Sequence, residues 1–424
     1  MNLLTNYPFF FDGPEYVALS RIPILEALHM AHPLAHPVSM GLGRLAYLLL
    51  GESVAALSLV SLLFWVGGTM MVASCVERGK RWIVYGICFL LPLPWMVMTN
   101  VGVDSVSTAL FISGVAILWR ERSWSRVGRA TALFGLSILN YMGMMAWLAI
   151  PVAIIWFDQK LSRRSRAGMV GGVMMSVIMG IGALLAMGLW TNRVGVGLSS
   201  MPVAIYHAGV AFMANYTWVS ALLVVGFGIS WAREGAWKKL IIMGGIVCIY
   251  VISLLPWHSG PYGRLGIFMV YPLAYLYARL PRWIVITLII LTLPSWFRVV
   301  RAYQETPLPI RQQEMVEESW CRDKQLVFSE IQRPQLSIIY SSAWYAGPSN
   351  WEEVAGKIKE GENICISQQA LDYPYFQFEG QLPYPLSGKE GSKGFLLTAL
   401  QSEKLELEKT DLKHPGLTIY RISR

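Results

Sequence analysis

The chain has 424 residues, of which 54% are hydrophobic and only 14% are charged, and it carries a formal net charge of +9 at pH 7. A typical soluble domain has about 25% charged residues, so this composition excludes a cytosolic enzyme, a disordered protein, a disulfide-rich secreted scaffold and a coiled coil. Most of the chain is therefore expected to lie in a membrane, and its basic charge is attributed to loops that flank membrane spans, with no nucleic-acid partner.

The charge is unevenly distributed along the chain. Residues 1–298 contain 21 Lys and Arg against 9 Asp and Glu, a net charge of +12, whereas residues 299–424 contain 14 against 17, a net charge of −3. Three regions are predicted: an external segment with amphipathic, juxtamembrane helices over 1–52, a multi-span membrane domain over 53–298, and a soluble extracytoplasmic α/β domain over 299–424. The predicted fold class is a polytopic α-helical membrane protein with about 9–11 membrane helices, some short or re-entrant.

Apolar runs mark the expected spans. They cover residues 53–75, 82–99, 103–119, 168–190, 217–232, 238–256, 265–280 and 283–297. Basic loops are expected on the cytoplasmic side; they lie at 77–81, 120–129, 160–166, 233–239 and 279–282. The segments expected outside are 1–52, 100–103, 191–216, 257–264 and everything after 298.

One apolar run, over 130–157, is interrupted at Asn140–Gly143. The basic loops on both sides of it are expected in the cytoplasm, so the run must cross the membrane twice, as a pair of short helices or a re-entrant hairpin. Broken helices at membrane depth line a cavity or are buried in protein. The break therefore predicts a site, with Asn140 and Tyr141 among its lining residues.

The N-terminal region is expected outside although no span precedes it in this sequence. Either the N-terminus is translocated unaided or an upstream first helix is missing from the chain, and we favour the missing helix. Because the positive-inside rule already explains the basic residues of the cytoplasmic loops, any chemistry is expected on the outer face.

Two carboxylates, Asp12 and Glu15, lie between an aromatic run and a tyrosine, with a Gly-Pro turn between them. A carboxylate held against apolar surface can accept a proton from a hydroxyl group, so Asp12 is the candidate general base. The spacing also fits a helix N-cap at Asp12 with Glu15 in the first turn. Both interpretations can hold together.

Further candidate residues follow along the outer face. His32 and His36 are each followed by Pro, which disfavours the helical geometry of an i, i+4 metal site, so capping of the helix that runs to Gly51 is expected and no metal site is predicted. Both histidines are also expected to line the external cavity with Asn140 and Tyr141. Asp104 opens the span after 100–103 and is either an N-cap or a second acidic group that faces the cavity.

The external loop 257–264 ends in Arg264. A guanidinium group pairs bidentately with phosphate, and the positive-inside rule does not account for a positive charge on this side. Arg264, with Tyr262 and His258, is the candidate phosphate-binding group. A snorkelling arginine is the alternative.

The run Phe11–Val17, followed by His32-Pro33, His36-Pro37 and Gly41, resembles the start of the GT-C glycosyltransferases, in particular the bacterial dolichyl-phosphate-mannose–protein mannosyltransferase-like branch. Residues 100–104 look like the second external loop of that family, and 136–151 are similar to its paired short helices. The resemblance covers roughly residues 5–298.

The resemblance implies a polyprenyl-phosphate-linked sugar as donor and transfer to a protein, lipid or glycan acceptor on the outer face of the plasma (inner) membrane. It implies that Asp12 is the catalytic base, that Asp104 is the acidic group of the second loop on the acceptor side, and that Arg264 contacts the lipid phosphate. No cofactor is required, and a divalent metal is compatible with the chemistry.

The C-terminal tail is expected to form a small α/β unit, with strands at 335–340, 362–367 and 416–422 and a helix over 351–359. It contains no nucleotide-binding loop, catalytic triad or metal cluster, and it is expected to orient an acceptor or cover the site. Cys321 and Cys365 could pair in an oxidising compartment, and their spacing leaves this open.

Two other functions stay open. A multi-span transporter or lipid flippase would also contain broken helices and intramembrane polar residues, although no half-to-half repeat is visible and the charges lie at the ends of the spans. A non-catalytic membrane scaffold whose tail binds a partner is the third hypothesis.

Overall fold

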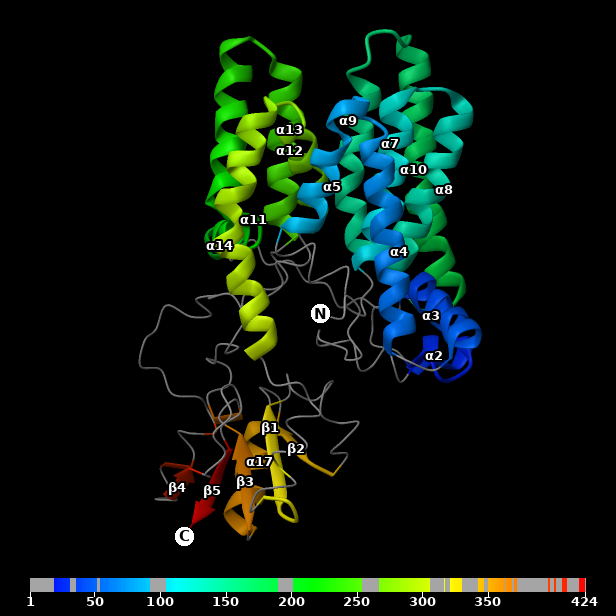
Figure 1. Cartoon of the computed structure of the whole chain (residues 1–424). Helices are drawn as coiled ribbons and strands as arrows, with labels where there is room; N and C mark the ends of the chain where they lie inside the picture. Colours follow the sequence, from blue (N-terminus) through cyan, green and yellow to red (C-terminus); the bar gives the residue numbers. More distant parts are fainter. Residues whose placement is uncertain are drawn as a thin grey trace. The chain divides into compact units, whose positions relative to one another are not determined.

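The computed structural model describes residues 19–30, 36–51, 54–91, 104–189, 201–253, 267–305, 316, 321–329, 342–346, 350–361, 363–367, 370–371, 396, 400–401, 406–409 and 419–423. The chain divides into two compact units between Trp296 and Phe297 (Figure 1). The sequence placed the corresponding boundary two residues later, at 298/299. The described residues up to Trp296 are called unit one and those from Phe297 onward unit two.

The described residues of unit one form helices and their connecting turns. The helices are α2 (Ile24–Met30), α3 (Pro37–Leu50), α4 (Val54–Ala73), η1 (Arg78–Lys80), α5 (Arg81–Leu90), α7 (Asp104–Arg120), α8 (Trp124–Asn140), η2 (Met142–Leu148), α9 (Ala149–Trp156), α10 (Arg163–Ala186), α11 (Met201–Arg233), α12 (Trp237–Ser253) and α13 (Val270–Tyr277). Helix α14 (Arg282–Glu305) crosses the division between the units.

Helices α4, α7, α8 and α10 lie side by side in that order (Figure 1). Glycines allow the close approach: a Cβ at Gly114 of α7 would come within 2.6 Å of the Phe134 ring, and one at Gly180 of α10 would come within 2.7 Å of Ile138. The Phe134 ring also packs on Phe111, with the ring centroids 4.9 Å apart. Small residues let the helix backbones approach closely, and the aromatic rings fill the space between them.

The break in the apolar run 130–157 is confirmed. Helix α8 ends at Asn140, Tyr141 has extended backbone angles, and the chain continues as the 3₁₀ helix η2 and then α9. Gly143 makes room for the Tyr141 ring at this point, because a Cβ there would lie 2.7 Å from Tyr141 Cε1. The run is therefore two helical arms that meet at the break.

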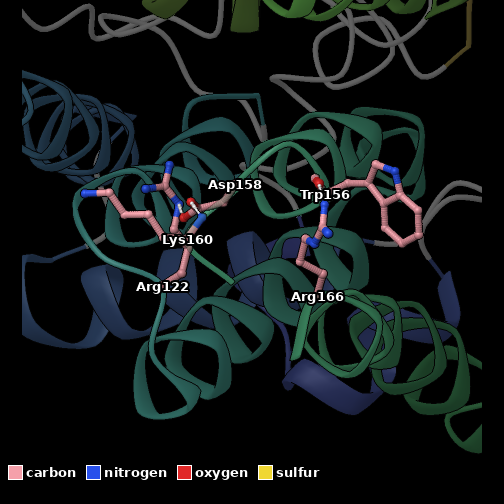
Figure 2. A network of polar contacts seen from close by, with 5 residues as sticks. All are labelled: Arg122, Trp156, Asp158, Lys160 and Arg166. Atoms are coloured by element: carbon pink, nitrogen blue, oxygen red, sulfur yellow. Dashed lines mark hydrogen bonds and ion pairs between the residues drawn. The ribbon is translucent and has the colours of Figure 1, made fainter. Parts of the chain in front are cut away.

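Polar contacts join the two basic loops at the other end of these arms (Figure 2). Arg122 Nε lies 3.3 Å from Asp158 Oδ2, and the backbone N–H of Lys160 donates to Asp158 Oδ1 at 3.0 Å. Arg166 donates to the carbonyl of Trp156 at 3.0 Å and its guanidinium carbon lies 5.9 Å from the Trp156 ring centroid. The loops therefore lie at one end of unit one, as the predicted pair of short helices requires.

The remaining basic loops lie at the same end, which we call the basic end. Arg282 donates to the carbonyl of Gly79 at 3.3 Å. The segments around Cys75, Trp119, Lys239 and Arg279 line a single cavity that is described below. One end of the helical unit thus collects the positive charge of five separate segments.

The expected number of membrane spans is not confirmed. Among the described residues, two helical stretches are long and apolar enough to cross a membrane, Ala55–Ala73 and Arg163–Ala186. Helix α13 has 8 residues where the apolar run 265–280 predicted a full span, and a membrane crossing needs about 17–25 residues.

Helix α11 is longer than the predicted span 217–232 and begins within the segment 191–216, whose expected external location stays a prediction. It has 33 residues and is about 50 Å long at 1.5 Å per residue, so the predicted span 217–232 is only its second half. The helix continues through 201–216 because no proline interrupts it after Pro202.

Unit two contains a five-stranded mixed sheet with the order β2-β1-β3-β5-β4. The strands are β1 (Gln325–Ser329), β2 (Trp344–Ala346), β3 (Ile364–Ser367), β4 (Glu406–Lys409) and β5 (Ile419–Ser423), and helix α17 spans Trp351–Glu360. Strand β1 is parallel to β2 and β3, whereas β5 is antiparallel to β3 and β4.

Alternating side chains give the sheet two apolar faces. Val327, Ile364 and Ile366 pack with buried residues of α17, whereas Leu326 and Phe328 pack on the opposite face around a disulfide between Cys321 and Cys365. This is the period of two that strands impose on their side chains.

The predicted α17, β3 and β5 are present within one to three residues of their predicted bounds. The predicted strand 335–340 lies outside the described residues. The sequence analysis missed β1, β2 and β4.

Candidate functional site

The candidate site lies at the break, at the end of unit one opposite the basic end. It is built around His36, which precedes Pro37 at the first position of α3. His36 makes no capping hydrogen bond with its side chain; instead its Nδ1 is hydrogen-bonded to the backbone carbonyl of Asn140. Because a carbonyl oxygen only accepts, Nδ1 carries the proton. His36 thus occupies the N-cap position of α3, but the expected capping by its side chain is not found.

Asn140, the last residue of α8, holds three segments together. Its Oδ1 accepts a hydrogen bond from the backbone N–H of Ser39 at 2.7 Å, and its Nδ2 donates to Ser39 Oγ at 2.9 Å and to Ser107 Oγ at 2.8 Å. The backbone N–H of Ser39 can only donate, so the orientation of the amide follows from the contacts. The Ser137 hydroxyl adds a bond to the Ser107 carbonyl at 2.7 Å.

This group, His36, Ser39, Ser107, Ser137 and Asn140, is called the Asn140 network. It connects the start of α3 with α7 and α8, three segments that the sequence placed on the outer side. Asn140 and Ser137 are fully buried, and His36 and Ser107 are nearly so. Buried polar groups are stable only when they are hydrogen-bonded, so the network fixes these segments relative to one another.

Asp104 lies close to the network along α7. It is the first residue of that helix, 6% exposed, and precedes Ser107 by three residues, a spacing that puts both on one face of the helix. A carboxylate in the first turn is favoured by the helix dipole. The structure therefore places Asp104 on the buried side of α7, near the Asn140 network.

Tyr141 continues from the network into the break. Its ring centroid lies 6.1 Å from that of His36, and the ring is partly buried. His36, Asn140 and Tyr141, which the sequence analysis predicted to line one cavity, are thus next to one another, with Asp104 one turn of α7 from Ser107.

The other predicted site residues lie outside the described residues. They are Asp12, Glu15, His32, His258, Tyr262 and Arg264. Their predicted roles in catalysis and phosphate binding stay predictions. Among the residues that the structure describes, no group of three or more His, Cys, Asp or Glu side chains is placed to hold a metal ion.

The serines of the network were missed as site residues. Ser39 follows His36 by three residues and Ser137 precedes Asn140 by three, so each serine shares a helical face with a predicted site residue. Ser107 has the same relation to Asp104. This repeated spacing was a usable signal, but serines are common in helices that cross membranes and the pattern is weak without the contacts.

Comparison with known proteins gives no match: no family model matches the chain, and neither a curated protein nor a solved structure is significantly similar to it.

Proposed function

We propose that the chain is an integral membrane glycosyltransferase that moves a sugar from a polyprenyl-phosphate donor to an acceptor on the outer face of the plasma (inner) membrane. The observation that carries the proposal is the Asn140 network. It ties the segment that follows Asp12 and Glu15 to the start of α7 at Asp104 and to the break after α8, which is what a site built from the first two external loops needs.

Exposed apolar surface supports a membrane location. Large apolar side chains of α10 such as Ile178 and Leu185 are 64% and 56% exposed, and Leu48 and Leu49 of α3 are more exposed still. Continuous exposed apolar surface of this kind marks a membrane or protein contact. On this proposal lipid covers it.

Tryptophans support the same location at the basic end. Six of them next to the basic loops are 38–70% exposed: Trp82, Trp119, Trp124, Trp156, Trp237 and Trp283. Tryptophan is enriched at the interface between lipid and water, and basic loops favour the cytoplasmic side. We therefore assign the basic end to the cytoplasmic interface and the Asn140 network to the outer half of the membrane.

The disulfide of unit two supports an outer location for the C-terminal domain. Disulfides persist in oxidising compartments and are rare in the cytosol. An odd number of membrane crossings between the basic end and Cys321 would put the Cys321–Cys365 pair in the oxidising compartment outside.

On this proposal the chemistry needs a base and a positive charge. Transfer from a phosphate leaving group requires a base on the acceptor hydroxyl and cationic groups at the departing phosphate. Asp12 is assigned the first role and Arg264, with Tyr262 and His258, the second, while Glu15 and Asp104 lie on the acceptor side.

The test is sugar transfer from radiolabelled polyprenyl-phosphate sugars in membranes that contain the full chain. Asp12→Asn is expected to lower turnover by at least about 100-fold and Asp104→Asn by at least about 10-fold. The control variant Glu26→Gln neutralises the exposed carboxylate of α2 and is expected to leave turnover unchanged. Turnover that survives Asp12→Asn would remove Asp12 from the mechanism.

A multi-span transporter or lipid flippase is the second candidate. It is favoured by the broken helix after α8 and by an apolar cavity at the basic end. The same membranes distinguish the two functions. A flippase moves the lipid-linked sugar across the bilayer without releasing the sugar, whereas a transferase releases the sugar from the lipid. Movement without release would support the flippase.

A further inference from the structure

The basic end of unit one contains a cavity of about 450 Å³, within the size range of ligand pockets. Most of its wall is apolar and comes from α7, α9, α11, α12 and α13, with Ile112, Val115, Ile154, Ile246 and Phe268 among the lining residues. We call it the basic-end cavity. It is separate from the Asn140 network, because α8 runs from the basic end at Trp124 to the network at Asn140.

Charged residues mark the open side of the basic-end cavity. Glu234, Lys239 and Arg279 line it and all three are exposed. They belong to basic-end segments that are far apart in the sequence. On the proposed membrane location, the cavity therefore opens at the interface between lipid and water and extends from there between apolar helices.

Aromatic side chains hold the two cations in place. Arg279 donates to the hydroxyl of Tyr275, and its guanidinium carbon lies 4.8 Å from the centroid of that ring. Lys239 Nζ lies 5.7 Å from the centroid of Trp231. Cations over aromatic rings are stabilised without being neutralised.

Neither cation has an ionic partner within the part of the chain that the structure describes. The nearby carboxylate of Glu234 accepts a hydrogen bond from the Ser230 hydroxyl at 2.7 Å. The mouth of the apolar cavity thus carries two cations and one carboxylate, so its net charge is positive. This arrangement fits a ligand with an anionic head and an apolar chain.

We propose that the basic-end cavity binds a membrane lipid, with its phosphate head group at Arg279 and Lys239 and one of its chains between α7, α12 and α13. A guanidinium group pairs bidentately with phosphate, and anionic lipids are concentrated in the cytoplasmic leaflet, where the basic loops place this end. This inference rests on the proposed membrane location and orientation, but not on the transfer reaction, which is assigned to the opposite end.

The test uses the purified full chain in lipid nanodiscs with a phosphatidylglycerol probe that carries a photoreactive diazirine at the end of one acyl chain. Cross-linked peptides are identified by mass spectrometry. Labels are expected on cavity-lining residues of α7, α12 and α13, and unlabelled phosphatidylglycerol is expected to displace the probe at about tenfold lower concentration than phosphatidylcholine. Equal displacement by both lipids would refute the head-group assignment.

Two double variants separate the cavity from general surface charge. Arg279→Gln with Lys239→Gln removes the two cavity cations, whereas Arg164→Gln with Lys238→Gln removes two exposed charges at the same end that do not line the cavity. The first pair is expected to weaken probe displacement about tenfold or more, and the second to leave it unchanged. Equal effects of the two pairs, or labels spread evenly over all lipid-facing helices, would overturn the proposal. None of these outcomes depends on sugar transfer.

Discussion

Asn140 is the residue on which the candidate site depends. Its amide is fully buried and makes hydrogen bonds to Ser39 and Ser107, residues 101 and 33 positions away in the sequence. Removing the amide leaves the backbone N–H of Ser39 and two serine hydroxyls without this partner in a buried place. A buried polar group without a partner costs about 1–3 kcal/mol.

Asn140→Ala is therefore expected to lower the free energy of unfolding by about 2–4 kcal/mol. The measurement is unfolding of the purified protein in mixed micelles. Ser125→Ala is the matched control, because it removes one hydroxyl that bonds Arg129 on the surface of the same helix, and it is expected to change stability by less than about 0.5 kcal/mol. Equal stability of the two variants would contradict the role given to Asn140.

At the scale of elements, the α8–α9 pair is held at both ends. The Asn140 network holds the break, and the ion pair between Arg122 and Asp158 holds the loops at the basic end (Figure 2). The side chains of this pair are 26% and 13% exposed, whereas those of Arg126 and Glu121 nearby are 32% and 57% exposed. Solvent screens the second pair more strongly.

A double-mutant cycle tests this difference. Arg122→Gln and Asp158→Asn are expected to show a coupling of about 1 kcal/mol in the free energy of unfolding, and Arg126→Gln with Glu121→Gln less than about 0.5 kcal/mol. The first coupling should also change less with added salt. If both couplings are equal, the contact between the loops does not stabilise the helix pair.

The disulfide joins β3 to the segment before β1 across 44 residues. Cys321→Ser with Cys365→Ser is expected to lower the free energy of unfolding of unit two by about 2–4 kcal/mol, because the unfolded chain gains the freedom of an open loop. The measurement is hydrogen exchange of the sheet amides with and without reductant. Cys248→Ser, at an exposed free cysteine, is the control and should leave the exchange unchanged. Reductant-insensitive exchange of the parent protein would show that the bond does not form.

At the scale of the whole molecule, composition and charge predict which ends of the helices lie on the same side of a membrane. The structure collects five basic segments at one end of unit one, together with a set of exposed tryptophans. This agrees with the positive-inside rule and with an aromatic belt at one interface. On the proposed topology, unit two is extracytoplasmic.

Cysteine labelling in intact spheroplasts measures this topology directly. In a chain in which Cys75, Cys88 and Cys248 are replaced, Lys160→Cys is expected to react with a membrane-impermeant maleimide only after permeabilisation, and Glu352→Cys without it. Both residues are exposed in the structure, so a negative result does not come from burial. The reverse pattern would move the candidate site to the cytoplasmic face.

Local patterns predicted the elements that depend on a few neighbouring residues. The polar and glycine break at Asn140–Gly143 predicted the two helical arms, and alternating apolar residues predicted β3 and β5. The short strand β2 and the charged strand β4 were missed, because their pairing with β1 and β5 forms them, not their own composition. The predicted apolar span 217–232 is the second half of α11, since hydropathy marks the apolar part of a helix and not its ends.

The sequence by itself determined that the chain is strongly apolar, that it breaks after α8, and that its basic residues cluster in short loops, because composition, turns and charge are local properties; that these loops face the cytoplasm stays a prediction. Only the tertiary structure decided that Asn140 meets Ser39 and Ser107, that Cys321 meets Cys365, and that Arg279 and Lys239 share a cavity. These contacts join residues far apart in the sequence, and which of them form depends on how the helices pack. Gly114 and Gly180, for example, allow a close approach only where a particular side chain of the neighbouring helix lies against them.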